Sequence, residues 1–334
     1  MKKVVILLLI IVLALCAWTG WEAWHKVFRP FQGYTGTTTV EIPEGETVSA
    51  AAESLERQGI ITSRTWFLVY YRLFHRGVAF KTGEYRFDRP MTMKEVILKL
   101  HRGHVILHKI TITEGLTIEE TAAAAAAQLG MDATKFLEAA RDPSAIRDLD
   151  PDADSLEGYL YPDTYHVPRT MNAAGLVALM VSHFRERFNR TLEWRSHEMK
   201  LTVRQVVTLA SIIEKETADR GERFLISSVF HNRLRIGMPL ASDPTIIYAL
   251  KREGKWRDKL GWAELKYDSP YNTRLYRNIP PGPICSPGIA SIEAALYPES
   301  TRYLYFVSKD GRQHYFSTTL REHNRAVRKY ILKK

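Results

Sequence analysis

The 334-residue sequence predicts an α+β protein that begins with a transmembrane helix. Three observations predict this class: an apolar run at residues 4–21, two copies of a strand–turn–helix pattern, and a second half that combines helical periods with one short hairpin. Apolar residues make up 45% and charged residues 25% of the chain, which is typical of a folded protein and excludes a disordered one.

The apolar run is long enough to cross a bilayer as a helix. Lys2 and Lys3 precede it and are expected to stay in the cytoplasm, which sends the rest of the chain outward. We expect residues 1–24 to be an uncleaved anchor, because Leu-Cys-Ala at residues 15–17 is a poor signal-peptidase site. The sequence therefore predicts a single-pass membrane protein with its bulk outside the cytoplasm.

The formal net charge is +10, which favours an acidic partner such as nucleic acid, anionic lipid or a carboxylate-bearing wall polymer. Nucleic acid is disfavoured because the basic bulk is expected outside the cytoplasm. Cys16 and Cys285 fall on either side of the predicted membrane boundary, so neither a disulfide framework nor a cysteine-rich zinc module is expected.

A linker with proline and glycine fills residues 25–38, and a repeat follows it over residues 39–150. Residues 39–48 align with residues 109–118: each copy alternates like a strand, turns at Glu-Gly and ends on a threonine that can cap a helix. We expect helices over residues 48–58, 65–74, 118–129 and 133–141, with a strand at 83–87 and a helix at 92–101 between the copies. The units resemble LysM modules, which bind N-acetylglucosamine-containing glycans; a spacer that binds no sugar is the alternative, and both stay open.

The sequence pattern changes at residue 151 and stays different to residue 334. Residues 156–167 are aromatic and predict an ordered loop, and the proline-rich residues 268–288 predict a second one. Helices are expected over residues 172–189, 202–217, 222–234 and 322–332, with a hairpin formed by residues 303–308 and 314–317.

Helix 202–217 contains the residue with the clearest chemical signal. On a helical wheel Glu214 lies about 20° from Val203, within an apolar stripe, and Glu216 lies about 160° from Glu214. A carboxylic acid held against apolar side chains loses hydration and stays protonated, as a general acid requires. We expect Glu214 to be that acid and Glu216 a surface or supporting group; the alternative is that Glu214 pairs with a buried arginine or caps a backbone.

Several blocks of sequence resemble the YceG-like family of endolytic murein transglycosylases, and they occur in that family's order. The most specific block is ASIIEKET at residues 210–217, which contains Glu214. The others are residues 156–165, 228–234, 240–248, 269–273, 279–284 and 322–324. One departure is the stretch at residues 285–288, where asparagine or a similar residue is expected near Cys285. The resemblance runs from the membrane anchor to the C-terminus and makes residues 151–334 a YceG-like catalytic domain.

The resemblance implies a lytic transglycosylase that cleaves the β-1,4 bond between N-acetylmuramic acid and N-acetylglucosamine in nascent glycan strands, leaving 1,6-anhydro ends. Glu214 carries over as the acid that protonates the glycosidic oxygen and then accepts the proton of the muramyl C6 hydroxyl. No cofactor or metal is implied. The implied location is the bacterial inner membrane, where the enzyme limits strand length beside peptidoglycan synthases, the penicillin-binding proteins of the elongation machinery.

Candidate sugar contacts are aromatic, amide and hydroxyl side chains in the matching blocks. They are Tyr159, Asp243, Thr245, Tyr271, Asn272, Thr273 and Asn324. Asp243 either starts a helix or orients Glu214, and Thr245 is a candidate helix cap. The aromatic residues have a second explanation, which is that they anchor the loops that contain them.

Other functions are compatible with parts of the sequence. Ser211 and Lys215 lie one helical turn apart, yet the Ser–Lys hydrolase spacing is one residue shorter. His101, His104 and His108 are disfavoured as metal ligands because a helix stop and a strand should make them diverge. Two further alternatives are a non-catalytic, membrane-anchored adaptor that recruits wall synthases, and a muramidase that uses water and leaves reducing ends.

Overall fold

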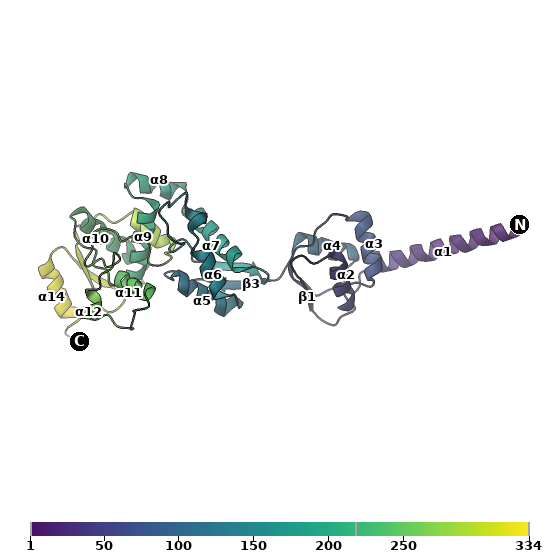
Figure 1. Ribbon diagram of the computed structural model, residues 1–334, viewed down its shortest axis with the longest axis horizontal. Coiled ribbons are helices and arrows are strands. Elements are labelled where there is room, and N and C mark those ends of the chain that lie inside the picture. Colours follow the sequence, from purple (N-terminus) through teal and green to yellow (C-terminus); the bar gives the residue numbers. More distant parts are fainter. Residues whose placement is uncertain (1, 218, 333–334) are drawn as a thin grey trace. The chain divides into compact units, whose positions relative to one another are not determined.

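The computed structural model describes residues 2–217 and 219–332, and it forms two compact units (Figure 1). The first unit contains Met1–Lys109 and His166–Met171, and the second contains Ile110–Tyr165 and Asn172–Lys334. Met1 and Lys334, the outer limits of the predicted anchor and catalytic domain, lie outside the described residues.

Helix α1 (Lys2–Phe28) is the predicted anchor. By length and composition it can cross a membrane, with a mean hydropathy of 2.7 over the best part of Lys3–Phe28. The helix continues past the predicted end at residue 24, because its last turn docks on the first unit: Val27 is buried and the Phe28 ring lies 5.8 Å from the Tyr70 ring.

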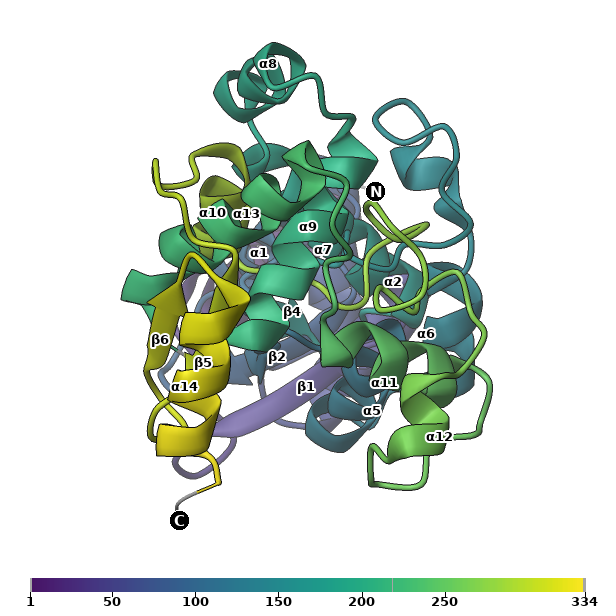
Figure 2. The ribbon, with the colours of Figure 1, turned by 90° about the vertical axis from the view of Figure 1, so that its left-hand side faces the viewer.

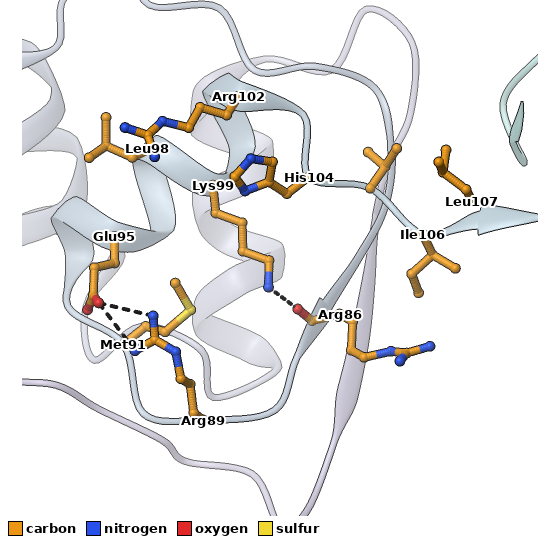
Figure 3. Close-up of a pocket in the computed structure, with 11 residues that line it drawn as sticks. Arg86, Arg89, Met91, Glu95, Leu98, Lys99, Arg102, His104, Ile106 and Leu107 are labelled. Carbon is orange, nitrogen blue, oxygen red and sulfur yellow. Dashed lines mark hydrogen bonds and ion pairs between the residues drawn. The ribbon is translucent and has the colours of Figure 1, made fainter. Parts of the chain in front are cut away.

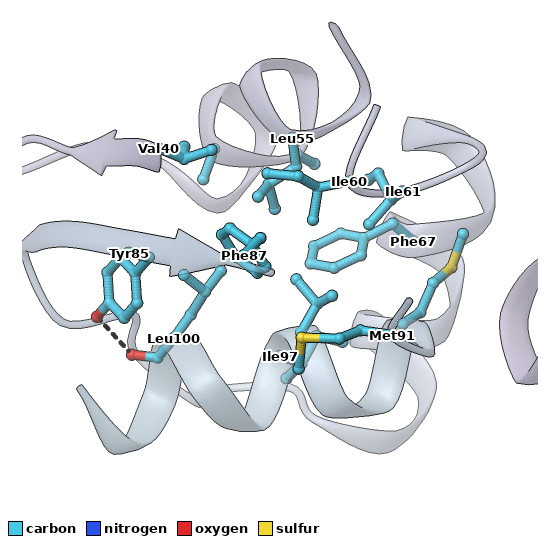
Figure 4. Packing of buried hydrophobic residues seen from close by; sticks show 14 of the residues in the cluster. Val40, Leu55, Ile60, Ile61, Phe67, Tyr85, Phe87, Met91, Ile97 and Leu100 are labelled. Atoms are coloured by element: carbon cyan, nitrogen blue, oxygen red, sulfur yellow. Dashed lines mark hydrogen bonds between the residues drawn. The ribbon is translucent and has the colours of Figure 1, made fainter. Parts of the chain in front are cut away.

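The first unit is a two-stranded sheet covered by helices. β1 (Thr38–Ile42) pairs antiparallel with β2 (Gly83–Phe87), and α2 (Val48–Arg57) and α3 (Arg64–Phe74) connect them. Helix α4 (Met93–Arg102) follows β2. Their inward faces form one core that includes Leu55, Phe67 and Phe87 (Figure 4). The predicted strand–helix–helix order is confirmed in this copy.

The second copy has the same order. β3 (Leu107–Thr111), α5 (Ile118–Leu129) and α6 (Ala133–Ala140) lead through a 3₁₀ turn (Pro143–Ile146) to β4 (Thr164–Pro168), and β4 pairs with β3. Thr47 and Thr117 cap α2 and α5, as predicted. Strand β4 was not predicted: its alternation, with Tyr165 and Val167 buried, is short and is hidden by flanking prolines.

The rest of the second unit is mainly helical and surrounds α9 (Val203–Glu216) (Figure 2). Its neighbours are α8 (Arg190–Glu198), α10 (Arg223–Arg235), α11 (Asp243–Arg252) and α13 (Ile289–Leu296). Helix α7 (Ala173–Arg187) packs on α6, and a 3₁₀ turn (Arg220–Glu222) precedes α10. The remaining elements are α12 (Trp262–Leu265), the hairpin β5 (Tyr305–Ser308) with β6 (His314–Ser317), and α14 (Leu320–Tyr330).

Residues 268–288 contain no helix or strand, as predicted, yet backbone hydrogen bonds hold them in place. The Gly115 N–H donates to the Ser286 carbonyl at 2.9 Å, and the Ser286 N–H donates to the Leu116 carbonyl at 2.8 Å. The Glu-Gly turn of the second repeat is therefore fastened to the end of the proline-rich segment, next to the start of α13.

The compact units do not divide at residue 150, where the sequence predicts a boundary. The second repeat belongs to the second unit because α6 packs on α7 and the turn at Gly115 is bonded to Ser286. As limits between functions, the bounds 25–38, 39–150 and 151–334 stay predictions.

Candidate active site

The middle of helix α9, residues 206–213, is buried around its whole circumference, so more than one apolar stripe of this helix faces the core. Thr202 caps its first turn with a capping box to Gln205. On the helical wheel Thr208 and Ser211 fall on the polar arc opposite Glu214, where exposure to solvent is expected, yet both are fully buried. The Ser211 hydroxyl donates to the Thr208 carbonyl at 2.7 Å and accepts the Ile284 N–H at 3.0 Å, which leaves no role for it as a nucleophile.

The Glu214 carboxylate lies in the last turn of α9 and accepts three hydrogen bonds; its side chain is only 6% exposed. Arg223 Nη2 lies 2.6 Å from Oε1. On Oε2, the Gly288 N–H donates at 3.0 Å and the Ser291 hydroxyl at 2.8 Å. The carboxylate thus joins α9 to the start of α10 and the start of α13.

This environment corrects the expectation of a purely apolar setting. The apolar stripe buries the stem of Glu214, but its two oxygens face an arginine, a hydroxyl and the N-terminal end of α13. All three donors and the positive end of a helix stabilise an ionised carboxylate. Transfer of a proton from Glu214 to a substrate would therefore involve a change at one of these contacts.

A second carboxylate shares the same guanidinium. Glu114 Oε2 lies 3.4 Å from Arg223 Nη2, and the Glu114 side chain is 34% exposed, whereas that of Arg223 is 4% exposed. Glu114 also lies against Gly288, since a Cβ on Gly288 would meet Glu114 Oε1 at 2.0 Å. Arg223 thus bridges a buried carboxylate and a solvent-accessible one.

A cavity of about 610 Å³ lies along α13 and the start of α8, and none of the carboxylates or donors of this cluster lines it. Its lining includes Phe224 and Ile289, which are the chain neighbours of Arg223 and Gly288. The other lining residues are Glu186, Arg187, Asn189, Thr191, Leu192, Glu293 and Tyr297. Aromatic, amide, hydroxyl and charged groups around an open cavity suit an oligosaccharide.

Glu216, two residues after Glu214, has different surroundings, as the helical wheel predicts. The expectation of a surface position is wrong: the Ser242 hydroxyl donates to Glu216 Oε1, and burial raises the pKa of the carboxyl. Ser242, the hydrogen-bond partner of this group, is the N-cap residue of α11. Glu216 is therefore the rival acid on α9.

The two predicted aromatic sugar contacts are core residues. Tyr159 is 1% exposed; its hydroxyl donates to Asp150 at 2.6 Å and its ring meets Phe184 edge-on. Tyr271 is 8% exposed, with its ring 5.1 Å from that of Tyr248. Neither ring offers a free face to a sugar, so the alternative of loop anchoring describes both.

The buried polar candidates hold loops together. The Asn272 amide donates to the carbonyls of Leu265 and Tyr267, at 3.1 and 2.8 Å. The Thr273 hydroxyl accepts the Ser242 N–H at 2.9 Å and lies 3.0 Å from the Thr245 hydroxyl. Thr245 lies inside the first turn of α11 and is fully buried, so it is not the cap residue, which is Ser242.

Asp243 and Asn324 are the exposed candidates. Asp243 is the first residue of α11, which confirms the helix-start alternative, and its carboxylate pairs with Arg274 at 2.6 Å. Asn324 lies exposed on α14. The contacts of Glu214 among the described residues include neither side chain.

Sequence reasoning missed Arg223, Ser291, Glu114 and a further buried acid, Glu157. A signal for Arg223 was present, because a cation in the first turn of a helix opposes the helix dipole and needs an acidic partner. Glu157 lies in the block 156–165: burial raises its pKa to about 8, and the Tyr248 hydroxyl donates to its Oε2 at 3.3 Å. No sequence period marks Ser291 or Glu114.

Comparison with known proteins places the chain in a family. The family model described as the YceG-like family matches residues 40–329. The chain belongs to the YceG-like family. The family match covers both repeats as part of one YceG-like region and does not identify them as LysM modules. The LysM-like assignment therefore stays a prediction.

Named relatives support the membership of this YceG-like chain. It is 36% identical to an endolytic murein transglycosylase of Bacillus subtilis, over 89% of this chain and 86% of the relative. It is 30% identical to one of Streptococcus pneumoniae, over 88% of this chain and 58% of that longer protein. A crystal structure of a YceG-like protein from Listeria monocytogenes matches with a TM-score of 0.60 and 33% identity, covering 87% of this chain and 99% of that one.

Proposed function

We propose that this protein is an endolytic peptidoglycan lytic transglycosylase. The names of its curated relatives support the activity, and they favour an enzyme over a non-catalytic adaptor. The observation that ties the activity to a residue is Glu214: it lies in the ASIIEKET block, its carboxylate is buried, and Arg223, Gly288 and Ser291 hold that carboxylate in place. We propose that the enzyme cleaves the β-1,4 bond after N-acetylmuramic acid within nascent strands.

The reaction needs one carboxyl group that gives and then takes a proton. Glu214 donates a proton to the glycosidic oxygen as the bond from C1 to that oxygen breaks. The C6 hydroxyl of the same muramyl residue attacks C1, and its proton passes to the Glu214 carboxylate. A 1,6-anhydro end forms without a bound water, and one carboxylate suffices where ordinary glycosidases need two.

Arg223 explains how one residue can serve both steps. While Arg223 contacts Glu214, the carboxylate is stabilised as an anion, which suits the proton-accepting step. Glu114 offers Arg223 a second partner 3.4 Å away. We propose that substrate binding shifts Arg223 toward Glu114, so that Glu214 loses its counter-ion and takes up the proton it must donate.

The site of action follows from α1. We propose that α1 anchors the protein in the bacterial inner membrane, with its N-terminus in the cytoplasm and both units outside. A tethered enzyme reaches strands as they are made, and peptidoglycan synthases are the expected partners. The exposed Asp243 and Asn324 remain proposed sugar contacts, and the paired strand–helix–helix units remain proposed LysM-like glycan contacts.

The deciding experiment compares wild type, Glu214→Gln and Glu216→Gln on un-crosslinked glycan strands, with products identified by mass spectrometry. Wild type should give muramyl ends lighter by one water, and Glu214→Gln should lower the rate by roughly a hundredfold or more. Glu216→Gln is the matched control on the same helix and should keep most of the activity.

Each other outcome has its own meaning. Loss of activity in Glu216→Gln alone would move the acid to Glu216. Reducing ends would indicate a muramidase that uses water. Strands left equally intact by wild type and Glu214→Gln would favour the adaptor.

A further inference from the structure

The first unit contains a basic cavity of about 640 Å³ that the cleavage reaction does not use. Strand β2, helix α4 and the segment after α4 line it (Figure 3). Four permanent cations and one histidine face a single carboxylate, Glu95; the basic residues are Arg86, Arg89, Lys99, Arg102 and His104. Such an excess of positive charge suits an anionic ligand.

Two of these cations are free to bind a ligand. Arg89 is paired with Glu95 at 3.2 Å, and Lys99 Nζ donates to the Arg86 carbonyl beside the Phe87 ring. The side chains of Arg86 and Arg102 are exposed and form no ion pair with any residue that the structure describes. A guanidinium presents a planar fork that binds phosphate oxygens in pairs.

The remaining lining is aliphatic: Met91, Leu98, Val105, Ile106 and Leu107. None of the lining residues is phenylalanine, tyrosine or tryptophan, so the cavity lacks the rings on which sugars usually stack. Cations beside aliphatic side chains instead match the boundary between phosphate headgroups and acyl chains.

The cavity is also joined to the base of the anchor. Helix α1 packs on α3 and α4 within the same unit. Phe31, three residues after the end of α1, forms a β-bridge with Met91 of the cavity, with its N–H 3.0 Å from the Met91 carbonyl. The rise of a helix places Phe28 only about 6 Å beyond Trp24, a residue suited to the membrane interface. The cavity wall is therefore held where the chain leaves the bilayer.

We propose that this cavity binds the phosphate of an anionic phospholipid in the leaflet from which α1 emerges, with Arg86 and Arg102 as the principal ligands. The inference rests on the membrane anchoring proposed above and not on the chemistry at Glu214. The bound lipid would fix the first unit against the membrane surface, in addition to the tether that α1 provides.

The test uses the full chain in mild detergent and native mass spectrometry with phosphatidylglycerol or phosphatidylcholine. Wild type should retain phosphatidylglycerol in preference to phosphatidylcholine. Arg86→Gln/Arg102→Gln should reduce the retained phosphatidylglycerol by roughly tenfold or more, since two cations near a lipid surface are removed. The matched control, Arg57→Gln/Arg72→Gln, removes two exposed arginines of the same unit outside the cavity and should behave as wild type.

Four results would overturn the proposal. Wild type could retain both lipids equally, or the two double variants could lose phosphatidylglycerol equally. Inorganic phosphate could displace the lipid at equal concentration, or an acidic muropeptide could bind through Arg86 and Arg102 in place of lipid. Cleavage of soluble strands, measured in parallel, should be unchanged in Arg86→Gln/Arg102→Gln. A wild type that binds phosphatidylglycerol but cleaves nothing would refute the proposed function and leave this proposal standing.

Discussion

Arg223 is the residue on which the site's electrostatics depend. It is buried, and its Nε and Nη1 atoms have no hydrogen-bond partner among the described residues, while Nη2 contacts Glu214 and Glu114. A buried guanidinium with two unused donor atoms is costly in a resting enzyme. A sugar oxygen entering beside Phe224 would be a natural acceptor for them.

The first prediction removes this charge. Arg223→Gln leaves Glu214 buried without its counter-ion, so the free energy of unfolding should fall by about 3–5 kcal/mol. The double variant Glu214→Gln/Arg223→Gln should recover part of that loss, because neither charge remains. Urea denaturation of wild type, Glu214→Gln, Arg223→Gln and the double variant measures the coupling, and additive losses would show that the pair is not coupled.

The second prediction concerns Glu157. Burial raises the pKa of this carboxyl from its ordinary 4.5 to about 8, and its Oε1 has no partner among the described residues. The folded state therefore holds the proton more tightly than the unfolded state, and stability should fall as the pH rises from about 4.5 to about 8.

Glu157→Gln removes this titration. Relative to wild type, the variant should gain a few kcal/mol of stability at pH 9 compared with pH 5, at about 1.4 kcal/mol for each unit of pKa shift. Urea denaturation at the two pH values measures the difference. An unchanged difference would mean that Glu157 is ionised in the folded protein.

At the scale of elements, the start of α13 lies against the side chains of both Glu214 and Glu114. The Gly288 N–H donates a hydrogen bond to Glu214, and the Glu114 side chain packs against the Cα of Gly288. The φ of Gly288 is −75°, which any residue adopts, so only the contact with Glu114 requires glycine.

The third prediction follows from that contact. In Gly288→Ala the new methyl group should push the flexible Glu114 side chain away from Arg223, while the hydrogen bond to Glu214 remains. Cleavage should slow to the same extent as in Glu114→Gln, by up to about a hundredfold, and combining the two changes should add nothing. Strand-cleavage rates of the three variants test this, and unaffected rates would remove Glu114 from the mechanism.

Helices with a clear period and cap could be predicted from the sequence. α2, α5 and α9 start at a threonine cap and end within a residue or so of their predicted ends. Strand β4 and helix α13 are not predicted, for physical reasons. Strand β4 is short, and α13 begins directly after the proline-rich loop, whose composition hides the change to a helix. Burial around the whole circumference of the middle of α9 also cannot be read from one sequence, which is why the helical wheel predicts Ser211 and Thr208 to face solvent although both are buried.

The site was predictable in its centre and not in its surroundings. The period of α9 places Glu214 and Glu216 in different environments, because side chains two positions apart on a helix diverge. Glu114 comes from a turn 100 positions earlier and Ser291 from a helix 77 positions later, so only the tertiary fold brings them to Glu214. The same holds for Tyr159, whose burial depends on Phe184.

For the whole molecule, the end of α1 belongs both to the anchor and to the core of the first unit. Val27 is buried in that core, and Phe28 meets Tyr70. The length of a soluble form therefore matters: a cut at residue 24 spares these contacts, and a cut at residue 29 removes them.

The fourth prediction compares these two truncations. Removing residues 1–24 should give a water-soluble protein that cleaves soluble strands at the wild-type rate. Removing residues 1–28 should lower its melting temperature, because one buried valine and one aromatic contact are lost, together about 2–4 kcal/mol. Calorimetry and strand cleavage check both forms, and equal melting temperatures would contradict the docking of α1.

The first unit takes residues from two separate stretches of the chain, since His166–Met171 returns to it through β4. Arg169 from that return contacts Glu84 of β2 at 3.3 Å. A protease that nicks the chain once near residue 109 would therefore leave the two halves attached through 166–171. A graft of this unit onto another enzyme therefore needs two splice points, because a fragment that stops at Lys109 would lack His166–Met171.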